Sequence, residues 1–499
     1  MDGRTWIGID LGTQSVRALA VADDGTVRAA ATRPLHSRHP ATTDGEVRHE
    51  QDPGEWTAAV DAALAEVVAG VDPAAVGGLA VDATSGTVVL TSEDGPLTPG
   101  VMYDDARGSP HVERVREVGA EVWDRLGYRV GASWALPTVL ALLEEHPGAR
   151  VRHQTDVVTA HLVGHDVPTD TSTALKTGYD LLADRWPAEV LTALGIDPGA
   201  LPAVVPSGRT LGGLGRDAAA ATGLRPGTPV LAGTTDGCAA QFGAGAVRPG
   251  DWNAVLGTTL VLKGVADRLL HDPAGTVYCH RDPQGGWWLP GGASSTGAAV
   301  LAQHVEPARF DVHTRALAAG GTGDLPVVYP LAGTGERFPF AAPDAEGFWL
   351  DGDRARPLAE LAGARGERTA FAALAEGVAF VERLCFEHVA GLGADVSGPR
   401  TITGGATRNP WWNQHRADVL GVALHRPDQA EPALGTAMLA RAGVAAGDGE
   451  PDLVAVAGEM VHVAEVLAPR HDPAIEERYA AFRAALAERG WIGPPGEDT

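Results

Sequence analysis

The sequence predicts an α/β protein of two large domains, and three features of the chain point to this. With 499 residues, the chain is longer than a single hydrophobic core usually becomes. Short apolar runs of strand length alternate with longer runs of helical spacing, a pattern typical of layered α/β folds. A strand–turn–strand pattern near the N-terminus also returns in the middle of the chain, which indicates two similarly built halves.

The composition is that of an ordinary globular protein with a strongly acidic balance. Hydrophobic residues make up 44% of the chain, and 39 basic against 64 acidic residues give a formal net charge of −25. No basic stripe offsets this charge, so we expect neither nucleic acid nor an anionic membrane as a partner. The three cysteines lie far apart and no run of 18 apolar residues exists. We therefore expect a cytoplasmic protein without a membrane span, and the oligomeric state, a homodimer included, stays open.

The repeated pattern consists of a strand, a turn rich in glycine and hydroxyl residues, and a return strand. Glycine allows an anion to approach the backbone closely, while hydroxyl and backbone N–H groups donate hydrogen bonds to it. The two turns are therefore candidates for holding the phosphates of ATP, and an ordinary hairpin is the alternative for either turn alone. The turns are Gly12-Thr13-Gln14-Ser15, between strand-like residues 6–10 and 16–22, and Gly257-Thr258-Thr259, between residues 253–256 and 260–265.

Two aspartates stand at the ends of predicted strands. Asp10 ends the first strand and is suited to bind Mg²⁺, directly or through water. Asp236 follows the buried strand 229–233 within a turn of small residues. A carboxylate held there can accept the proton of a hydroxyl that attacks a phosphate. The alternative is that Asp236 caps a helix beginning at Cys238.

A third glycine-rich passage, Gly404-Gly405-Ala406-Thr407-Arg408-Asn409, follows the predicted strand 400–403. Paired glycines let a flat adenine or ribose lie against the backbone, and Asn409 can bond to it. A turn that begins a helix is the alternative. No Gly-Lys dipeptide exists, which excludes a P-loop, and His280-Arg281-Asp282 resembles a protein-kinase catalytic loop but has Trp287 where that loop needs Asn.

Apolar spacing also predicts the main helices and the domain boundary. We expect a linker turn, and hence the boundary, near residues 245–250. Helices are expected at residues 56–68, 112–126, 369–389 and 436–440, and a short buried strand at 77–81.

Four passages, in this order along the chain, resemble the FGGY carbohydrate kinases. They are Ile9-Asp10-Leu11-Gly12-Thr13, Gly233-Thr234-Thr235-Asp236-Gly237, Gly257-Thr258-Thr259 and Gly404 to Asn409. The resemblance continues through His49-Glu50-Gln51-Asp52-Pro53 with Trp56, Asp105-x-Arg107 and Gly335-Glu336-Arg337-x-Pro339. It spans residues 6 to 445 and implies two actin-like (ribonuclease H-like) ATPase domains with an interdomain catalytic cleft.

The resemblance implies an ATP- and Mg²⁺-dependent kinase that transfers phosphate to the primary hydroxyl of a ketopentose, D-ribulose or D-xylulose, giving the 5-phosphate. Residues 1–247 would form the sugar-binding domain, and residues 248–499 the nucleotide-binding domain with a C-terminal helical tail. Asp236 would be the general base and Asp10 the metal ligand. The sugar-binding residues would be Asp10, Gln14, Ser15, Arg17, Thr84, Ser85, Asp105 and Asp236. The ATP-binding residues would be Gly12, Thr13, Gly257, Thr258, Thr259, Gly404, Gly405, Ala406 and Asn409.

One loop departs from the xylulokinase pattern. Residues 82–87 read Asp-Ala-Thr-Ser-Gly-Thr, where typical xylulokinases carry Gln and His. With residues 102–105 and 174–180, this loop is more similar to the plant and cyanobacterial D-ribulose kinases, so we expect D-ribulose to be preferred over D-xylulose and glycerol to be a poor substrate. The alternatives are a kinase for another polyol or sugar acid such as glycerol or gluconate, a chaperone-type actin-like ATPase, and a sugar sensor without kinase activity.

Overall fold

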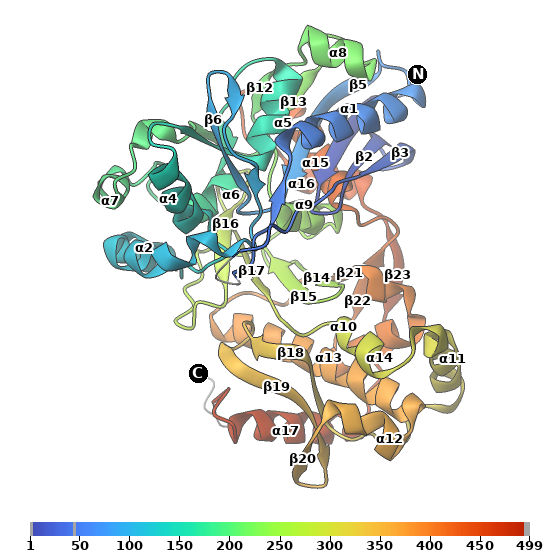
Figure 1. Ribbon diagram of the computed structural model, residues 1–499. Helices are drawn as coiled ribbons and strands as arrows, with labels where there is room; N and C mark the ends of the chain where they lie inside the picture. Colours follow the sequence, from blue (N-terminus) through green and yellow to red (C-terminus); the bar gives the residue numbers. More distant parts are fainter. Residues whose placement is uncertain (1–2, 43–45, 494–499) are drawn as a thin grey trace. The chain divides into compact units, whose positions relative to one another are not determined.

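The computed structural model describes residues 3–42 and 46–493, whose contacts divide the chain into two compact units. The first unit consists of Met1–Val247, His280–Leu289 and Gln429–His462. The second consists of Arg248–Cys279, Pro290–Asp428 and Val463–Thr499. The chain therefore returns to the first unit twice after leaving it, and Figure 1 shows the second return as α15 and α16 beside the N-terminal strands.

The central sheet of the first unit has six strands in the order β12-β13-β5-β1-β2-β3. Strand β1 pairs antiparallel with β2 and parallel with β5, so Asp10 has Arg17 on one side and Asp82 on the other. The strands are β1 Thr5–Leu11, β2 Ser15–Ala22, β3 Val27–Pro34, β5 Val76–Ala83, β12 Thr210–Gly213 and β13 Pro229–Leu231. The predicted first hairpin is confirmed.

Helices cover both faces of this sheet because successive residues of a strand point to opposite faces. Ile7 and Ile9 of β1 belong to the apolar cluster that contains side chains of α1, α5 and α8. Gly8 faces α15 instead, and a Cβ there would lie 1.8 Å from the carbonyl oxygen of Ala433. Glycine thus allows α15 to lie directly on the sheet. The helices are α1 Pro53–Ala69, α5 Gln154–Val163, α8 Arg216–Thr222, α9 Asp236–Gly243, α15 Pro432–Ala446 and α16 Leu453–Met460.

A smaller sheet and short helices complete the first unit. Its strands are β4 Glu50–Gln51, β6 Val88–Ser92, β7 Gly95–Pro96, β8 Gly100–Val101 and β9 Arg150–His153, with the separate pair β10 Thr169–Asp170 and β11 Val204–Val205. The helices are α2 Val112–Val118, α3 Ala120–Leu126, α4 Ala135–Glu145, α6 Thr171–Ala174 and α7 Ala188–Leu194. The helical prediction for residues 112–126 is confirmed except that Gly119 divides the segment into α2 and α3; the Trp123 ring there lies 2.2 Å from the position of a Cβ on Gly119.

The second predicted hairpin lies in a seven-stranded sheet of order β16-β17-β15-β14-β21-β22-β23. Strand β14 pairs antiparallel with β15 and parallel with β21, as β1 does with β2 and β5. The repeat of strand, turn and return strand is thus confirmed. The strands are β14 Trp252–Leu256, β15 Leu260–Gly264, β16 Tyr278–Arg281, β17 Trp288–Ala293, β21 Arg400–Thr403, β22 Leu424–Pro427 and β23 Val463–Leu467.

The core of the second unit is organised by one long buried helix, α13 Glu367–Gly391, which contains the predicted helix 369–389. Its Glu382 forms an ion pair with Arg416 of α14 at 2.7 Å, and both side chains are fully buried. The other elements are α10 Ala299–His304, α11 Phe310–Gly320, α12 Leu361–Arg365, α14 Pro410–Leu420, α17 Pro473–Ala487, β18 Val328–Glu336, β19 Ala342–Asp351 and β20 Arg354–Pro357.

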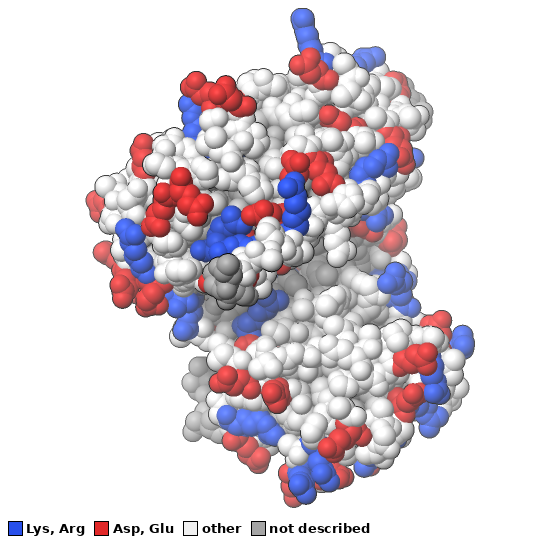
Figure 2. Space-filling view, viewed as in Figure 1, with Lys and Arg blue, Asp and Glu red and all other residues white. Residues whose placement is uncertain are grey.

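The surface carries both signs of charge. On the face seen in Figure 2, Asp and Glu side chains are interspersed with Lys and Arg. Among the helices of residues 3–42 and 46–493, none is long and apolar enough to cross a membrane.

Candidate active site

Three aspartates from separate segments lie close together in the first unit. Asp10 is the last residue but one of β1, Asp82 lies beside it on β5, and Asp236 is the first residue of α9. Burial, and next the negative charge of Asp236, raise the pKa of Asp10 from 3.8 to about 7. Burial and the charge of Asp10 raise the pKa of Asp82 well above its ordinary value. Asp10 and Asp236 were predicted from the sequence, but Asp82 was missed as a site residue, although it too ends an apolar run.

Helix α15 brings two further side chains to this acidic cluster. The hydroxyl of Thr436 donates a hydrogen bond to Oδ2 of Asp82, from 354 residues further along the chain. Glu431, just before the helix, forms an ion pair with Arg17 at 3.3 Å. Arg17, predicted as a donor to sugar hydroxyls, therefore has a carboxylate partner, and its positive charge favours the ionised form of Asp10.

Asp236 lies in the first turn of its helix. The helix begins at Asp236 and its N-cap is Thr235, so the alternative in which Asp236 caps a helix beginning at Cys238 is wrong. The N–H of Gly237 donates to Oδ1 of Asp236 at 2.7 Å. The positive end of the helix dipole favours a carboxylate at this point. A Cβ on Gly233 would lie 1.7 Å from the carbonyl oxygen of Val81, so the turn before Asp236 packs directly onto β5.

Buried hydroxyl groups hold the turn that carries Asp236. Oγ of Ser172 lies 3.0 Å from the hydroxyl of Thr235 and accepts the backbone N–H of Thr235 at 3.4 Å. The same oxygen lies 2.9 Å from Nδ1 of His280. Ser172, Thr235 and His280 are all nearly inaccessible to solvent. His280, which the sequence grouped with a kinase-like tripeptide, thus contacts the residue that fixes this turn.

The loop predicted to contact sugar is held by Gln154 at the start of α5. The hydroxyl of Thr84 donates to Oε1 of Gln154 at 2.7 Å and lies 2.6 Å from the hydroxyl of Thr87. Within the described residues, Oγ of Ser85 and Nε2 of Gln154 are buried and have no hydrogen-bond partner. Buried polar groups usually bind protein, water or ligand, so each of these atoms is suited to bind a polar molecule.

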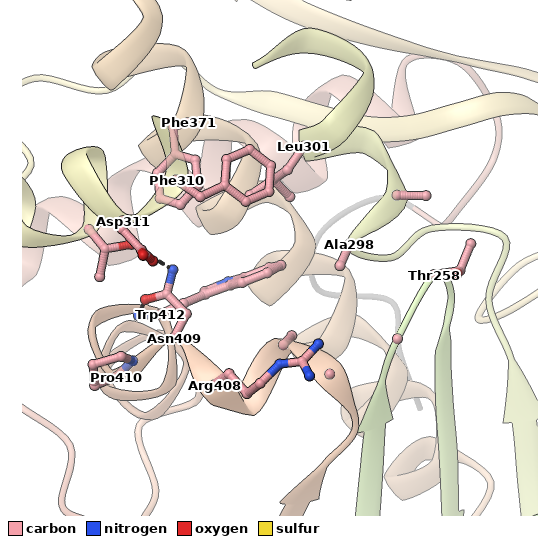
Figure 3. A pocket seen from close by; sticks show the side chains of 15 residues that line it. Thr258, Ala298, Leu301, Phe310, Asp311, Phe371, Arg408, Asn409, Pro410 and Trp412 are labelled. Carbon is pink, nitrogen blue, oxygen red and sulfur yellow. Dashed lines mark hydrogen bonds between the residues drawn. The ribbon is translucent and has the colours of Figure 1, made fainter. Parts of the chain in front are cut away.

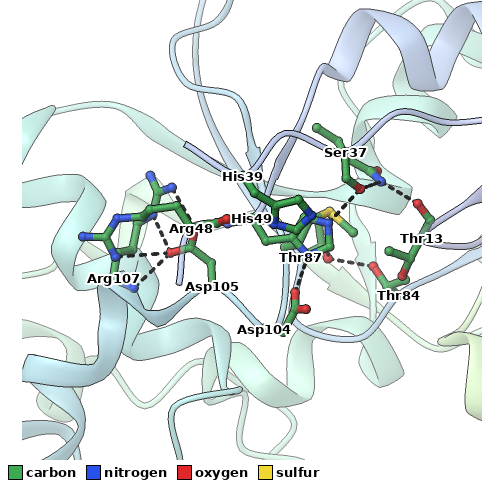
Figure 4. A network of polar contacts seen from close by, with 12 residues as sticks. Thr13, Ser37, His39, Arg48, His49, Thr84, Thr87, Asp104, Asp105 and Arg107 are labelled. Carbon is green, nitrogen blue, oxygen red and sulfur yellow. Dashed lines mark hydrogen bonds and ion pairs between the residues drawn. The ribbon is translucent and has the colours of Figure 1, made fainter. Parts of the chain in front are cut away.

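Asp105, also predicted to contact sugar, lies in a network of arginines (Figure 4). Its carboxylate accepts Nε of Arg107 at 2.8 Å and the backbone N–H of His49 at 2.8 Å. Burial opposes ionisation, but the hydrogen bonds from Arg107 and His49 lower the pKa of Asp105 on balance. Asp105 is 2% exposed, and its carboxylate already accepts hydrogen bonds from Arg107 and His49.

The first hairpin turn is tied to the same region through Gln51. Nε2 of Gln51 donates to the carbonyl oxygen of Thr13 at 2.6 Å, and Oε1 accepts the indole N–H of Trp56 at 2.8 Å. The carbonyl of Gln14 accepts the N–H of Leu35 at 2.9 Å, and Ser15 begins β2. The His49-to-Pro53 motif therefore fixes the turn that contains Gly12 and Thr13.

The second unit contains a cavity of about 580 Å³ (Figure 3). Five of the predicted ATP-binding residues line it, whereas Gly404 and Thr259 are not among its lining residues and Gly12 and Thr13 belong to the first unit. Most of the other lining side chains are apolar, and Figure 3 shows the Phe310 and Phe371 rings on one side with the Trp412 ring beneath them. The five residues are Gly257, Thr258, Gly405, Ala406 and Asn409.

Asn409 both caps a helix and lines the cavity. Its Oδ1 accepts the N–H of Trp412 at 3.0 Å, and its Nδ2 donates to the hydroxyl of Thr314 at 2.9 Å. The turn and the ligand-binding interpretations of the Gly404–Asn409 passage are therefore compatible. Arg408 also lines the cavity and adds a positive charge that the sequence analysis did not assign to the site.

Comparison with known proteins agrees with these features. The model of the N-terminal domain of the FGGY family of carbohydrate kinases matches residues 5–243, and that of the C-terminal domain matches residues 252–444. Xylulose kinase from Streptomyces rubiginosus is 31% identical, with 98% of each chain covered. The chain belongs to the FGGY family of carbohydrate kinases. It is an ATP-dependent kinase that phosphorylates an alcohol group of a carbohydrate, so the chaperone-type alternative is excluded.

Other FGGY relatives are similar over the same length. Glycerol kinase from Trichlorobacter lovleyi is 28% identical over 98% of this chain and 99% of its own. The crystal structure of xylulose kinase from Rhodospirillum rubrum superposes with a TM-score of 0.81 at 27% identity, covering 98% of this chain and 99% of that one. The actin-like fold of the family is therefore shared over nearly the whole chain.

The side chains of this FGGY kinase can be compared with the ligands that Mg²⁺ requires. Among the described residues, no group of three or more His, Cys, Asp or Glu side chains is arranged to hold a metal ion. Mg²⁺ is usually bound by one or two carboxylates together with waters and substrate phosphates. A single carboxylate such as Asp10 fits an ion that is brought by ATP.

Proposed function

We propose that this FGGY kinase phosphorylates the primary hydroxyl of a ketopentose to the 5-phosphate, with Asp236 as the general base. The observation that carries the proposal is the position of Asp236, in the first turn of α9 beside Asp10 and Asp82. A carboxylate held at this point can accept the proton of an attacking hydroxyl. The first unit would bind the sugar and the second the nucleotide.

The chemical step requires little covalent participation by the protein. As the sugar oxygen attacks the γ-phosphorus, its proton passes to the carboxylate of Asp236, while the bond from the γ-phosphorus to the β–γ bridging oxygen breaks and ADP leaves. The backbone N–H of Gly237 and the N-terminus of α9 fix this carboxylate, and Ser172 holds the preceding turn. Gly12 and Thr13 in the first unit and Gly257, Thr258 and Thr259 in the second remain the proposed phosphate-binding residues.

The cavity of the second unit is proposed as the site of the adenosine group. Its volume and aromatic walls suit a flat purine, and Gly405 and Ala406 allow close approach of the ring or ribose. Mg²⁺, bound with ATP, would neutralise phosphate charge, and Asp10 would hold it directly or through water. The magnesium dependence of turnover in Asp10→Asn measures this role, and an unchanged dependence would remove Asp10 from it.

A ketopentose is favoured over glycerol by two observations. Two relatives named xylulose kinase are 31% and 30% identical over 98% and 91% of this chain. The loop Thr84–Thr87 also offers several hydroxyl groups, and Oγ of Ser85 and Nε2 of Gln154 are buried without a hydrogen-bond partner among the described residues. A site that binds several hydroxyls discriminates strongly against a substrate that lacks them. The same loop is the reason to expect D-ribulose to be preferred over D-xylulose.

A coupled assay of ADP release with D-ribulose, D-xylulose, gluconate and glycerol tests the proposal. We expect kcat/KM for a ketopentose to exceed that for glycerol by on the order of 10²-fold. Carbon and phosphorus NMR of the product should place the phosphate on C5. Preference for glycerol or gluconate would overturn the ketopentose assignment, and a preference for D-xylulose would overturn only the order of the two pentuloses.

A further inference from the structure

The Gly335-Glu336-Arg337 motif has no role in the function described so far, yet Glu336 is the centre of a buried network. The residue is 3% exposed at the end of β18. Its Oε1 accepts the backbone N–H groups of Ser295 at 2.6 Å and Arg337 at 3.0 Å. Its Oε2 accepts the hydroxyls of Ser294 at 3.1 Å, Thr296 at 3.0 Å and Tyr329 at 3.1 Å. Five donors thus converge on one carboxylate.

Three of these donors belong to residues 294–296, which lie against the second hairpin. The N–H of Ser294 donates to the carbonyl of Leu260 at 2.9 Å, and the carbonyl of Thr296 accepts the N–H of Leu260 at 2.8 Å. Immediately afterwards, Ala298 donates its N–H to the carbonyl of Gly257 at 2.9 Å. The segment therefore continues the pairing of β15 up to the turn.

The contact with the turn itself is close. A Cβ on Gly297 would lie 2.3 Å from the carbonyl oxygen of Thr258, and the N–H of Ala299 donates to that oxygen at 3.2 Å. Thr258 and Ala299 both line the cavity of the second unit. A shift of residues 294–297 must therefore move the turn Gly257–Thr259.

We propose that Glu336 is a positioning residue for ATP, which fixes residues 294–296 and through them the phosphate-binding turn Gly257–Thr259. The proposal rests on the proposed role of this turn in holding nucleotide phosphates. Glu336 itself does not contact the nucleotide. Its contribution is to keep the N–H and hydroxyl groups of the turn in one arrangement before ATP binds, so that less conformational freedom is lost on binding.

The donor set explains why a carboxylate is needed. The two partners of Oε1 are backbone N–H groups, which can only donate, so an amide nitrogen at that position would face them without a bond. Burial and the charge of Glu336 raise the pKa of Tyr329, which keeps its hydroxyl protonated as a donor. In Glu336→Gln the amide nitrogen can lie only at the position of Oε2. The hydroxyls of Ser294, Thr296 and Tyr329 must then rotate so that they accept hydrogen bonds from it. The shape is kept while the charge-assisted hydrogen bonds are lost.

Asp272 provides a matched control in the same unit. It is a buried carboxylate that accepts the backbone N–H and the hydroxyl of Thr276 at 2.6 and 2.7 Å, and the N–H of Val277 at 2.9 Å. These are the kinds of donor that Glu336 binds, but they belong to the turn before β16 and not to residues 294–296. Asp272 differs from Glu336 in that it also lies 3.4 Å from Nε2 of His388. Asp272→Asn therefore removes a comparable charge without touching the segment that backs Gly257–Thr259.

The experiment compares Glu336→Gln, Asp272→Asn and the unmodified full-length chain. ADP binding is measured by calorimetry, and KM for ATP and for the sugar by coupled assay. We expect the Kd of ADP and the KM of ATP to rise by on the order of 10-fold to 100-fold in Glu336→Gln, as expected when a binding group is misplaced. The KM of the sugar should stay within twofold, and Asp272→Asn should leave the nucleotide constants unchanged even if it lowers Tm.

Unchanged ADP affinity in a folded Glu336→Gln protein would overturn the proposal, as would an equal rise of both KM values. If that variant does not fold, Thr296→Val removes one donor to Oε2 and should raise the Kd of ADP in the same direction; no change there would also overturn it. ADP binding needs no turnover, so this test gives its answer even if no ketopentose is phosphorylated. Failure of the proposed function and failure of the positioning role are therefore distinguishable.

Discussion

The two hairpins of this protein have the same backbone pattern but differ at one position, which is a carboxylate in the first and an apolar side chain in the second. In the first, Asp10 precedes Leu-Gly-Thr; in the second, Val255 precedes Leu-Gly-Thr. Asp10 has Asp82 beside it on the parallel strand, whereas Val255 has Thr403. The first hairpin thus ends in a group of buried carboxylates, and the second ends beside a cavity with aromatic walls.

This difference assigns different tasks to the two regions. Buried carboxylates whose pKa values are raised are costly to keep ionised and suit proton transfer and metal binding. Glycine turns beside aromatic rings are suited to hold a nucleotide without changing its charge. Substitutions in the first region should therefore reduce turnover, and substitutions around the second should weaken nucleotide binding.

The largest expected effect is that of Asp236→Asn. The amide keeps the shape of the side chain but cannot accept the proton, so kcat should fall by about 10²- to 10⁴-fold. The KM of ATP and the affinity for sugar should change little, because the turn and its hydrogen bonds remain. Steady-state kinetics with the preferred ketose measure this. Turnover near that of the unmodified enzyme would show that another group accepts the proton.

A smaller effect is expected for Ser172→Ala, which removes the hydroxyl that holds Thr235 next to the base. We expect kcat to fall about 10-fold through misplacement of the carboxylate, with the KM of ATP unchanged. Ser207→Ala is the matched control, since Ser207 is equally buried and its hydroxyl donates to Asp170 at 3.4 Å, whereas within the described part of the chain it makes no hydrogen bond to Thr235. Equal losses of kcat in the two variants would contradict a specific role of Ser172.

The smallest effect concerns stability, and it has a defined pH dependence. Because the pKa of Asp10 is raised to about 7, the folded protein binds this proton more tightly than the unfolded chain does. The stability contributed by the protonated group is lost as the pH rises through 7, so ionised Asp10 destabilises the fold at pH 8. Asp10→Asn should therefore raise the free energy of unfolding at pH 8 by on the order of 2 kcal/mol.

Thermal unfolding without ligands checks this prediction. The Tm of Asp10→Asn should exceed that of the unmodified protein by roughly 4–8 °C at pH 8. At pH 5 the difference should shrink, since Asp10 is then protonated in the folded state. A lower Tm of the variant at pH 8 would show that the interaction with Arg17 outweighs the repulsion from Asp236 and Glu431.

Much of the fold could be predicted because its signals are local. Strands of apolar residues that end in Gly-Thr turns defined both hairpins. Helical spacing defined α1, since burial of one face imposes this period, and a long apolar segment defined α13, which is buried on all sides over residues 370–382. The glycine passages, Asp10 and Asp236 were found in the same way, because a strand end or a tight turn leaves a recognisable run of small and polar residues. The break between α2 and α3 was missed because it depends on where the Trp123 ring packs.

The rest of the site was decided by tertiary structure alone. Thr436 reaches Asp82 across 354 residues, and Phe371 and Trp412 meet Gly257 from separate helices. No local pattern distinguishes these side chains from other buried residues. Glu336 was part of a motif, but its role depends on residues 294–296 lying between it and the second hairpin. The sequence by itself determined which turns can hold phosphates and which carboxylates end strands; long-range packing decided which side chains tune those carboxylates and support those turns.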